Sequence, residues 1–85
     1  MEYTFKSPVN IGDDIYLLNS WNGKFYGHIT ADKVQLVGFS KKNIHIKARD
    51  NHDHNKMYIL GKNCFADASI AKEKLEEARK KGLVL

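Results

Sequence analysis

The chain has 85 residues, of which 42% are hydrophobic and 28% are charged, and its formal net charge is +4. This composition is typical of one globular domain and excludes a disordered chain. No apolar run approaches the ~18 residues of a membrane-spanning helix, and the single cysteine excludes an internal disulfide or a four-cysteine zinc site.

The small size also limits the function. A chain of this length buries only about 60–65% of the surface that its unfolded form exposes, so we expect a thin core without a large internal active-site cavity. The opening residues, MEYTFKSP, lack the basic-then-apolar pattern of a signal peptide. We therefore expect a cytosolic protein, in the bacterial host cytosol if it is phage-encoded. The pI of about 9.2 favours anionic partners without requiring them.

The first half of the chain predicts an edge strand and a hairpin. Residues 3–6 predict a short strand ended by Ser7-Pro8, and Gly12 and Asp13 suit a turn. Residues 15–30 then form two extended runs around Asn22-Gly23, the preferred pair for a type I′ turn. The implied register places Trp21 opposite Lys24 and Leu17 opposite His28. One face of this hairpin, the expected core face, carries Tyr16, Leu18, Phe25 and Ile29. The other carries Leu17, Trp21, Lys24, Tyr26 and His28.

Three further strands and a short extended piece follow. Residues 33–40 are rich in Val, Leu and Phe, and Gly38 within them suggests a bulge or a close approach of another element. Residues 44–49 alternate strictly, which places one apolar row toward the core and one basic row on the other side. The apolar row is Ile44, Ile46 and Ala48, and the basic row is His45, Lys47 and Arg49. Residues 56–60 predict another strand, and Cys64-Phe65 a short extended piece.

The end of the chain predicts a helix over 67–82. Asp67 is its expected N-cap and Gly82 the residue that follows its last turn. Its apolar stripe is narrow and consists of Ala68, Ala71, Leu75 and Ala78. Residues 83–85 form an apolar tail that we expect to dock on the body.

These elements predict an α+β fold: one small, strongly bent antiparallel sheet of about five strands, an SH3-like half-barrel, with one C-terminal helix over an open end. A flatter sheet with the helix on one face is the alternative. We expect a single domain, with a β-sheet body at 1–66, the helix at 67–82 and the tail at 83–85.

The runs IGDDIYLL and GKNCFADASIAKEKLEEARKKG resemble a family of short prophage and mobile-element proteins of Gram-positive bacteria. In that family a Gly-Asp start precedes a few barrel strands, and a Phe before an Ala/Glu-rich helix closes the chain. This chain departs from the pattern at residues 31–43, a longer segment than the family's, and at the start of the helix, which lacks an acidic pair. The resemblance implies a phage-like origin and a small non-catalytic effector or binding module, and it transfers no site residue.

The reactive side chains give little support to an enzyme. A metal site is not complete with His52 and His54 and either His45 or His28 as a third ligand. We interpret the segment around His52 and His54 as a hydrophilic loop. Cys64 has no neighbour in the sequence that would activate its thiol as a nucleophile, and we interpret it as a core residue. Asp13 and Asp14 point apart on a turn. We expect no catalytic residue, no metal and no cofactor.

Two surfaces remain as binding sites. The first is the basic row, which is His45, Lys47 and Arg49, together with Lys41 and Lys42. Its spacing permits contacts with nucleic-acid phosphates; the alternative is that it only forms the solvent-exposed face of the sheet. The aromatic hairpin face, Trp21, Lys24, Tyr26 and His28, suits a protein hot spot or base stacking, unless the helix or tail covers it. If the strand at 44–49 lies beside the hairpin at 15–30, the two form one surface.

We therefore expect a non-enzymatic phage-type binding protein that occupies a host protein, such as an inhibitor of a CRISPR-type or signalling defence. The alternatives are a small nucleic-acid-binding module, a basic sheet that sequesters a small anionic ligand such as a nucleotide signal, and a phage structural or assembly component. A homodimer through an exposed edge strand or the apolar tail is compatible with all of these.

Overall fold

The computed structural model describes residues 9–50 and 56–85. The edge strand predicted at 3–6 and the histidine loop with His52 and His54 lie outside the described residues. The described elements are β1 (Asp14–Leu17), β2 (Ser20–Trp21), β3 (Lys24–Phe25), β4 (Thr30–Phe39), β5 (Ile44–Ala48), β6 (Tyr58–Ile59), β7 (Cys64–Phe65) and the helix α1 (Ala68–Lys80).

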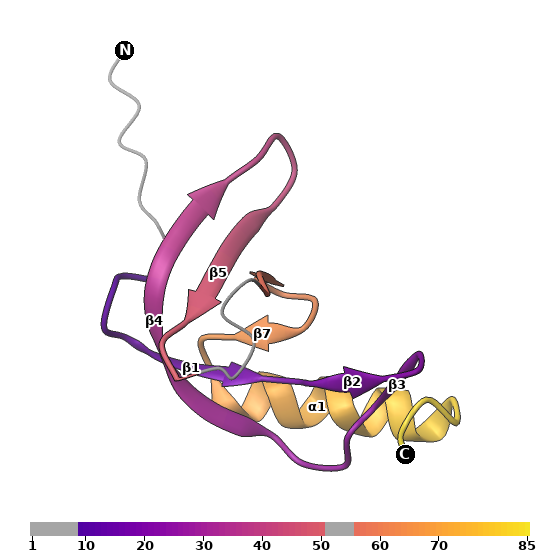
Figure 1. The fold of residues 1–85 in the computed structure, drawn as a ribbon. Helices are drawn as coiled ribbons and strands as arrows, with labels where there is room; N and C mark the ends of the chain where they lie inside the picture. The colour runs from indigo at the N-terminus through magenta and orange to yellow at the C-terminus, as the bar shows by residue number, and fades with distance from the viewer. Residues whose placement is uncertain (1–8, 51–55) are drawn as a thin grey trace.

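Five of the strands form one antiparallel sheet in the order β6-β5-β4-β1-β7, and β2 and β3 form a separate hairpin (Figure 1). The five-stranded sheet curls until its two edge strands meet. A bridge between Leu60 and Cys64 joins the end of β6 to the start of β7, and the Gly61 N–H donates to the Cys64 carbonyl at 2.8 Å. The predicted α+β class, a strongly bent five-stranded sheet with one C-terminal helix, is confirmed as a nearly closed barrel-like sheet.

The long strand β4 bends the sheet because it changes partner along its length. Its first part, Thr30–Lys33, pairs with β1, and its second part, from Val34 on, pairs with β5. The register shifts between Val34 and Leu36, so the extra residue lies where the partner changes, and a bulge increases the bend and twist there. A bulge at Gly38 is wrong: this residue pairs regularly with His45.

The predicted long register of the 15–30 hairpin is also wrong. The turn and its first pairs are as expected, with Ser20 opposite Phe25 and Trp21 opposite Lys24. Leu17, however, lies opposite Thr30 rather than His28. The ladder breaks after the Tyr26 N–H donates to the Asn19 carbonyl, because β4 pairs with β1 two residues out of step with the hairpin.

Strand β1 lies between two apolar clusters. The barrel cluster contains Val9, Ile15, Leu17, Val34, Ile46, Ala48, Tyr58 and Cys64. The helix cluster contains Leu18, Phe65, Ala71 and Leu75, with Tyr16, Phe25, Ile29 and Val84 packed against it. Leu17 is therefore buried rather than part of the exposed hairpin face, because alternate β1 side chains enter different clusters.

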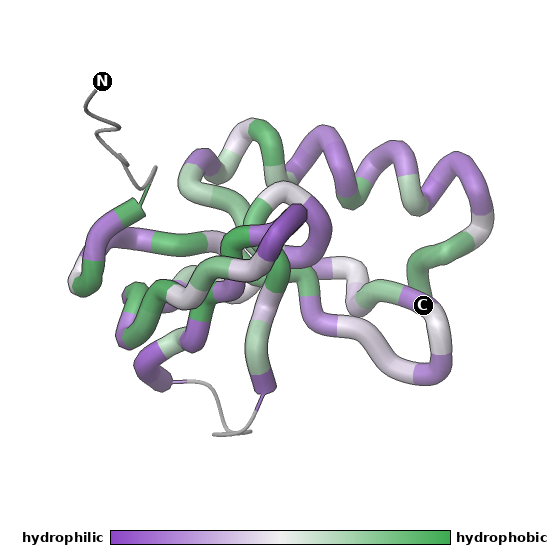
Figure 2. Tube along the Cα trace, turned by 90° about the horizontal axis from the view of Figure 1, so that it is seen from above, coloured by the Kyte–Doolittle hydropathy of each residue, from purple (hydrophilic) through white to green (hydrophobic). Residues whose placement is uncertain are grey.

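Helix α1 packs on the outer side of β1 and β7, not over an open end of the barrel (Figure 1). Its N-cap is Asp67, whose side chain accepts the Ser69 N–H at 2.8 Å, and Gly82 follows its last turn with φ +73°. Both ends match the prediction. Figure 2 shows a mainly hydrophilic helix with few apolar positions. Its buried residues are Ala71, Leu75 and Ala78, whereas Ala68 is exposed, so its predicted place on the buried stripe is wrong.

The apolar tail docks on the body as predicted, as an extended segment beside β3. Val84 forms a parallel bridge with Phe25. The Phe25 N–H donates to the Leu83 carbonyl, and the Leu85 N–H donates to the Phe25 carbonyl, both at 2.8 Å. The β2–β3 hairpin is thereby fixed in two ways: it follows β1 in the chain, and the tail forms hydrogen bonds with β3.

Candidate functional site

The β2–β3 hairpin presents its aromatic side chains to solvent. Asn22 (φ 55°) and Gly23 (φ 83°) both adopt the positive φ that a type I′ turn requires. This turn fixes Trp21 opposite Lys24. Trp21 is 66% exposed and Tyr26 is 38% exposed, so neither the helix nor the tail covers them. The rings of Tyr26 and His28 stack with centroids 5.9 Å apart.

The tail adds two leucines to this aromatic face. Phe25 and Val84 are bridge partners and both pack into the helix cluster. Because side chains alternate along a strand, their neighbours on the tail, Leu83 and Leu85, point to the opposite face, which is also the face of Tyr26. Leu83 is 42% exposed and Leu85 is 58% exposed.

We call this surface the apolar end face and define it by six residues: Trp21, Lys24, Tyr26, His28, Leu83 and Leu85. The sequence predicts the four hairpin residues as part of a surface, but not the two leucines. The alternation of Leu83, Val84 and Leu85 is a sequence signal for two leucines on one face. It shows which surface they join only when the tail is placed beside β3. The structure thus enlarges the predicted aromatic face.

The basic row lies on β5, on the side away from the barrel cluster. Ile46 and Ala48 are buried as predicted and Ile44 is half-buried. His45 and Lys47 are half-buried, and Arg49 is exposed just after the strand. The His45 Nε2 and the Ser40 Oγ are hydrogen-bonded at 3.1 Å. The turn before β5 carries Lys41 and Lys42, both exposed.

The basic row and the apolar end face do not form one surface. β5 pairs with the second part of β4, whereas the β2–β3 hairpin follows β1, which pairs with the first part. The two surfaces therefore lie toward opposite ends of β4, and Figure 1 shows the β4–β5 turn well away from β2 and β3. The condition for a joint cationic and aromatic surface is not met.

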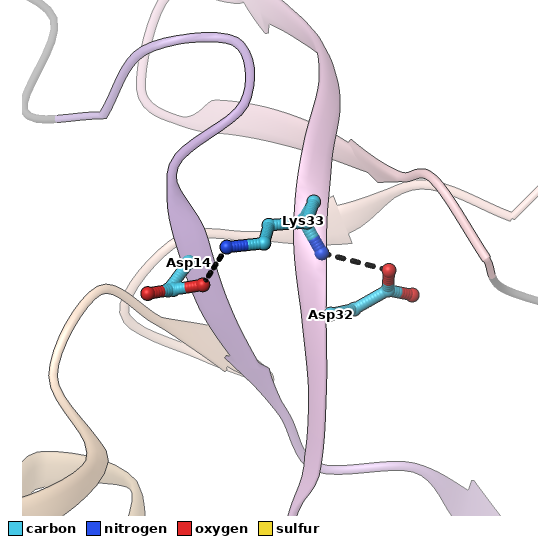
Figure 3. Close-up of polar contacts among 3 residues, drawn as sticks. All are labelled: Asp14, Asp32 and Lys33. Atoms are coloured by element: carbon cyan, nitrogen blue, oxygen red, sulfur yellow. Dashed lines mark hydrogen bonds and ion pairs between the residues drawn. The ribbon is translucent and has the colours of Figure 1, made fainter.

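Acidic side chains near the start of β4 have structural partners (Figure 3). The Asp14 carboxylate forms an ion pair with Lys33 on the neighbouring strand, and this hydrogen bond raises the pKa of the Lys33 ammonium. Asp32 is buried, and its Oδ1 accepts the Lys33 N–H at 2.7 Å and the Asp50 N–H at 3.1 Å. Asp13 accepts the Asn10 N–H at 2.8 Å. Asp13 and Asp14 thus serve different contacts.

Cys64 is a buried residue of the barrel cluster, with no exposed surface. Burial raises the pKa of its thiol to about 12, so the thiolate that nucleophilic attack needs is scarce at neutral pH. Within residues 9–50 and 56–85, no three His, Cys, Asp or Glu side chains gather closely enough to hold a metal ion.

A shallow apolar hollow of about 340 Å³ lies where α1 begins, lined mainly by Leu60, Phe65, Ala66 and Ile70, with Lys74 at its rim. Ile70 is 45% exposed there. Phe65 is a member of the helix cluster and is only 3% exposed, so the hollow lies against that core without opening it to solvent.

The comparisons add no relative to these observations. Searches against protein-family models, curated proteins and solved structures find no match. Across the described ranges, α1 is too short and too polar to cross a membrane, and no other helix is present there.

Proposed function

We propose that this chain is a non-enzymatic binding protein that docks on a protein partner through the apolar end face. The observation that carries the proposal is the placement of four apolar side chains on one side of β2, β3 and the adjoining tail. They are Trp21, Tyr26, Leu83 and Leu85, each between 38% and 66% exposed. A thin core gains from burying such side chains, so leaving four of them in water on one face is typical of an interaction site.

The composition of the face favours a protein partner. Tryptophan and tyrosine dominate the binding energy of protein interfaces, and they do so from the centre of an apolar patch with a polar rim. Here Trp21 and Tyr26 adjoin the two leucines, and Lys24 and His28 supply polar groups. The hairpin is held by backbone hydrogen bonds from the tail, which lowers the entropic cost of ordering it on binding.

The resemblance to prophage and mobile-element proteins supports a host protein as the partner and inhibition of a host defence, CRISPR-type or signalling, as the consequence. A partner that is blocked by occupancy requires only a rigid, complementary surface. A small domain with an exposed apolar face supplies such a surface. We place this activity in the bacterial host cell.

The test uses Trp21, the only tryptophan of the chain, as its own reporter. The tagged protein is used to purify partners from nuclease-treated host lysate, next to a face variant (Trp21→Ser, Leu85→Ser) and a matched variant on the exposed side of α1 (Lys72→Ser, Ile70→Ser). We expect one stoichiometric protein that is retained by the wild type and the α1 variant and lost by the face variant.

Titration of that protein should then shift the Trp21 emission to the blue, because the indole leaves water. Two outcomes would overturn the proposal: no protein retained after nuclease treatment, or equal retention by the face variant and the wild type.

A further inference from the structure

A second surface, at the other end of β4, has the properties of an anion-binding ribbon. We call residues 33–49 the basic hairpin; they cover most of β4, the turn and β5. This segment contains five cationic residues, Lys33, Lys41, Lys42, Lys47 and Arg49, and no Asp or Glu. A run of this length without a carboxylate is a local positive field in a chain whose overall charge is only +4.

Most of these cations form no ion pair with the residues that the structure describes. Lys33 pairs with Asp14, and the other ion pairs of the described ranges, Lys74 with Glu77 and Arg79 with Glu76, lie on α1. Lys41, Lys42, Lys47 and Arg49 thus take part in no ion pair among residues 9–50 and 56–85. Four cations on a single hairpin that pair with none of the described carboxylates leave their charge available to an external polyanion.

The strand register aligns the cations along the ribbon instead of around a point. Val37 with Ile46 and Val34 with Ala48 form the pairs that face the barrel cluster, so Leu36 with Lys47 and Gly38 with His45 face away from it. Successive residues of the basic row are about 6.5–7 Å apart, the two-residue rise of a strand. Lys41 and Lys42 extend the row at the turn, which projects from the body in Figure 1.

From this arrangement we infer that the basic hairpin binds the phosphate backbone of duplex nucleic acid, without reading its sequence. A row of spaced cations fits a polymer of phosphates better than one small anion. A two-stranded ribbon also has the width that the major groove of DNA admits. The outer pairs of the hairpin are Leu36 with Lys47 and Gly38 with His45. Neither pair contains a Trp, Tyr or Phe. Phe39 is 51% exposed but pairs with Ile44 on the other face of the hairpin, so the outer pairs lack the aromatic ring on which single-strand binders stack bases, which favours a duplex.

This site is independent of the apolar end face, so the two tests can fail separately. Binding of a labelled 20-base-pair duplex is measured by fluorescence anisotropy between 50 and 200 mM salt. With four phosphate contacts, the slope of log K against log salt is about −3.6, which is a loss of roughly 10²-fold over this range.

The variant is Lys47→Gln with Arg49→Gln, and the matched control, with the same change of net charge, is Lys72→Gln with Lys80→Gln on α1. We expect the slope of the hairpin variant to fall to about −1.8, since each lost contact removes about 0.9. The control and the face variant, Trp21→Ser with Leu85→Ser, should keep the wild-type slope.

Three results would overturn the inference: salt-insensitive or absent binding to the duplex by the wild type, equal slopes for the hairpin variant and its control, or tighter binding to a 20-nucleotide oligo(dT) than to the duplex. A parallel titration with vesicles containing 30% phosphatidylserine covers the other anionic surface of a cell. Hairpin-dependent binding to vesicles but not to the duplex would also overturn it.

Discussion

The buried phenol of Tyr58 on β6 donates its hydroxyl proton to the side-chain oxygen of Asn19, the residue just before β2. The amide nitrogen of Asn19 in turn lies 3.4 Å from the Thr30 Oγ1 at the start of β4. The Asn19 carbonyl accepts the Tyr26 N–H. One asparagine thus connects the barrel core to the base of the apolar end face.

Removing the Tyr58 hydroxyl should destabilise the fold. Tyr58→Phe leaves the half-buried Asn19 oxygen without its donor while the ring still fills the core, so we expect a loss of about 1–3 kcal/mol in the free energy of unfolding. Urea denaturation of Tyr58→Phe, Asn19→Ala and the double variant measures the coupling between the two side chains. Strictly additive losses would show that this hydrogen bond contributes nothing to stability.

The Cys64 thiol should make the protein less stable at high pH. Its pKa rises from 9.0 in the unfolded chain to about 12 in the folded state because burial disfavours the thiolate. A raised pKa gives a stabilising contribution that is complete below pH 9.0 and is lost as the pH rises toward 12. We expect the urea midpoint of the wild type to fall between pH 8 and pH 10.5 by more than that of Cys64→Ala.

The comparison with Cys64→Ala removes the contribution of tyrosine and lysine titration, which both proteins share. Parallel pH dependence of the two proteins would contradict the prediction. Alkylation by iodoacetamide at pH 8 should also be slow in the folded wild type and fast in urea, because the thiol has no exposed surface when folded.

The features that were predicted correctly from the sequence depend on neighbouring residues. The Asn22-Gly23 turn needs two positive φ angles, and the helix ends need a capping side chain at Asp67 and a positive φ at Gly82. Each requirement is met by one or two residues in a row, whatever the rest of the fold does. The alternation around Ile46 is equally local, because apolar and polar residues that alternate along one strand place one row toward the core and the other toward solvent.

The features that were missed depend on segments far apart in the chain. Leu17 is buried because β1 pairs with β4 and β7 at the same time, and hairpin symmetry alone places it on the wrong face. Leu83 and Leu85 join the apolar end face only because the tail runs beside Phe25. Asp32 is buried because its carboxylate ties the end of β5 to β4, a role that one acidic residue within a strand does not reveal.

The stabilising effect of Asp67, the N-cap of α1, should be lost in acid. Hydrogen bonds from the Ser69 hydroxyl and backbone N–H lower the pKa of Asp67 below its usual 3.8. A lowered pKa gives a stabilising contribution that is present above pH 3.8 and is lost as the pH falls through the folded-state value. We expect Asp67→Ala to be less stable than the wild type at pH 6, with the difference shrinking toward pH 2.

Asp67→Asn is the matched control, since asparagine also caps helices but carries no titrating group. Its denaturation midpoint should follow that of Asp67→Ala in parallel between pH 6 and pH 2, at a higher level. A wild-type advantage over Asp67→Ala that persists unchanged at pH 2 would rule out the carboxylate as the source of the capping effect.

The helix cluster should couple α1 to the apolar end face. Leu75 is 6% exposed and packs with Leu18 and Phe65, whereas Ile70 on the same helix is 45% exposed. Leu75→Ala should therefore cost about 2–4 kcal/mol by leaving a cavity, and Ile70→Ala well under half of that. Because Phe25 and Val84 pack on the same cluster, the loss should reach the tail as well.

Hydrogen exchange of the two tail-docking amides measures this coupling directly. The N–H groups of Phe25 and Leu85 are held by the tail hydrogen bonds, and in Leu75→Ala they should exchange faster at urea concentrations well below the unfolding midpoint. In Ile70→Ala they should exchange as in the wild type. If Leu75→Ala lowered global stability yet left these two amides as protected as the barrel amides, the apolar end face would be held by the hairpin alone, and α1 would have no part in positioning it.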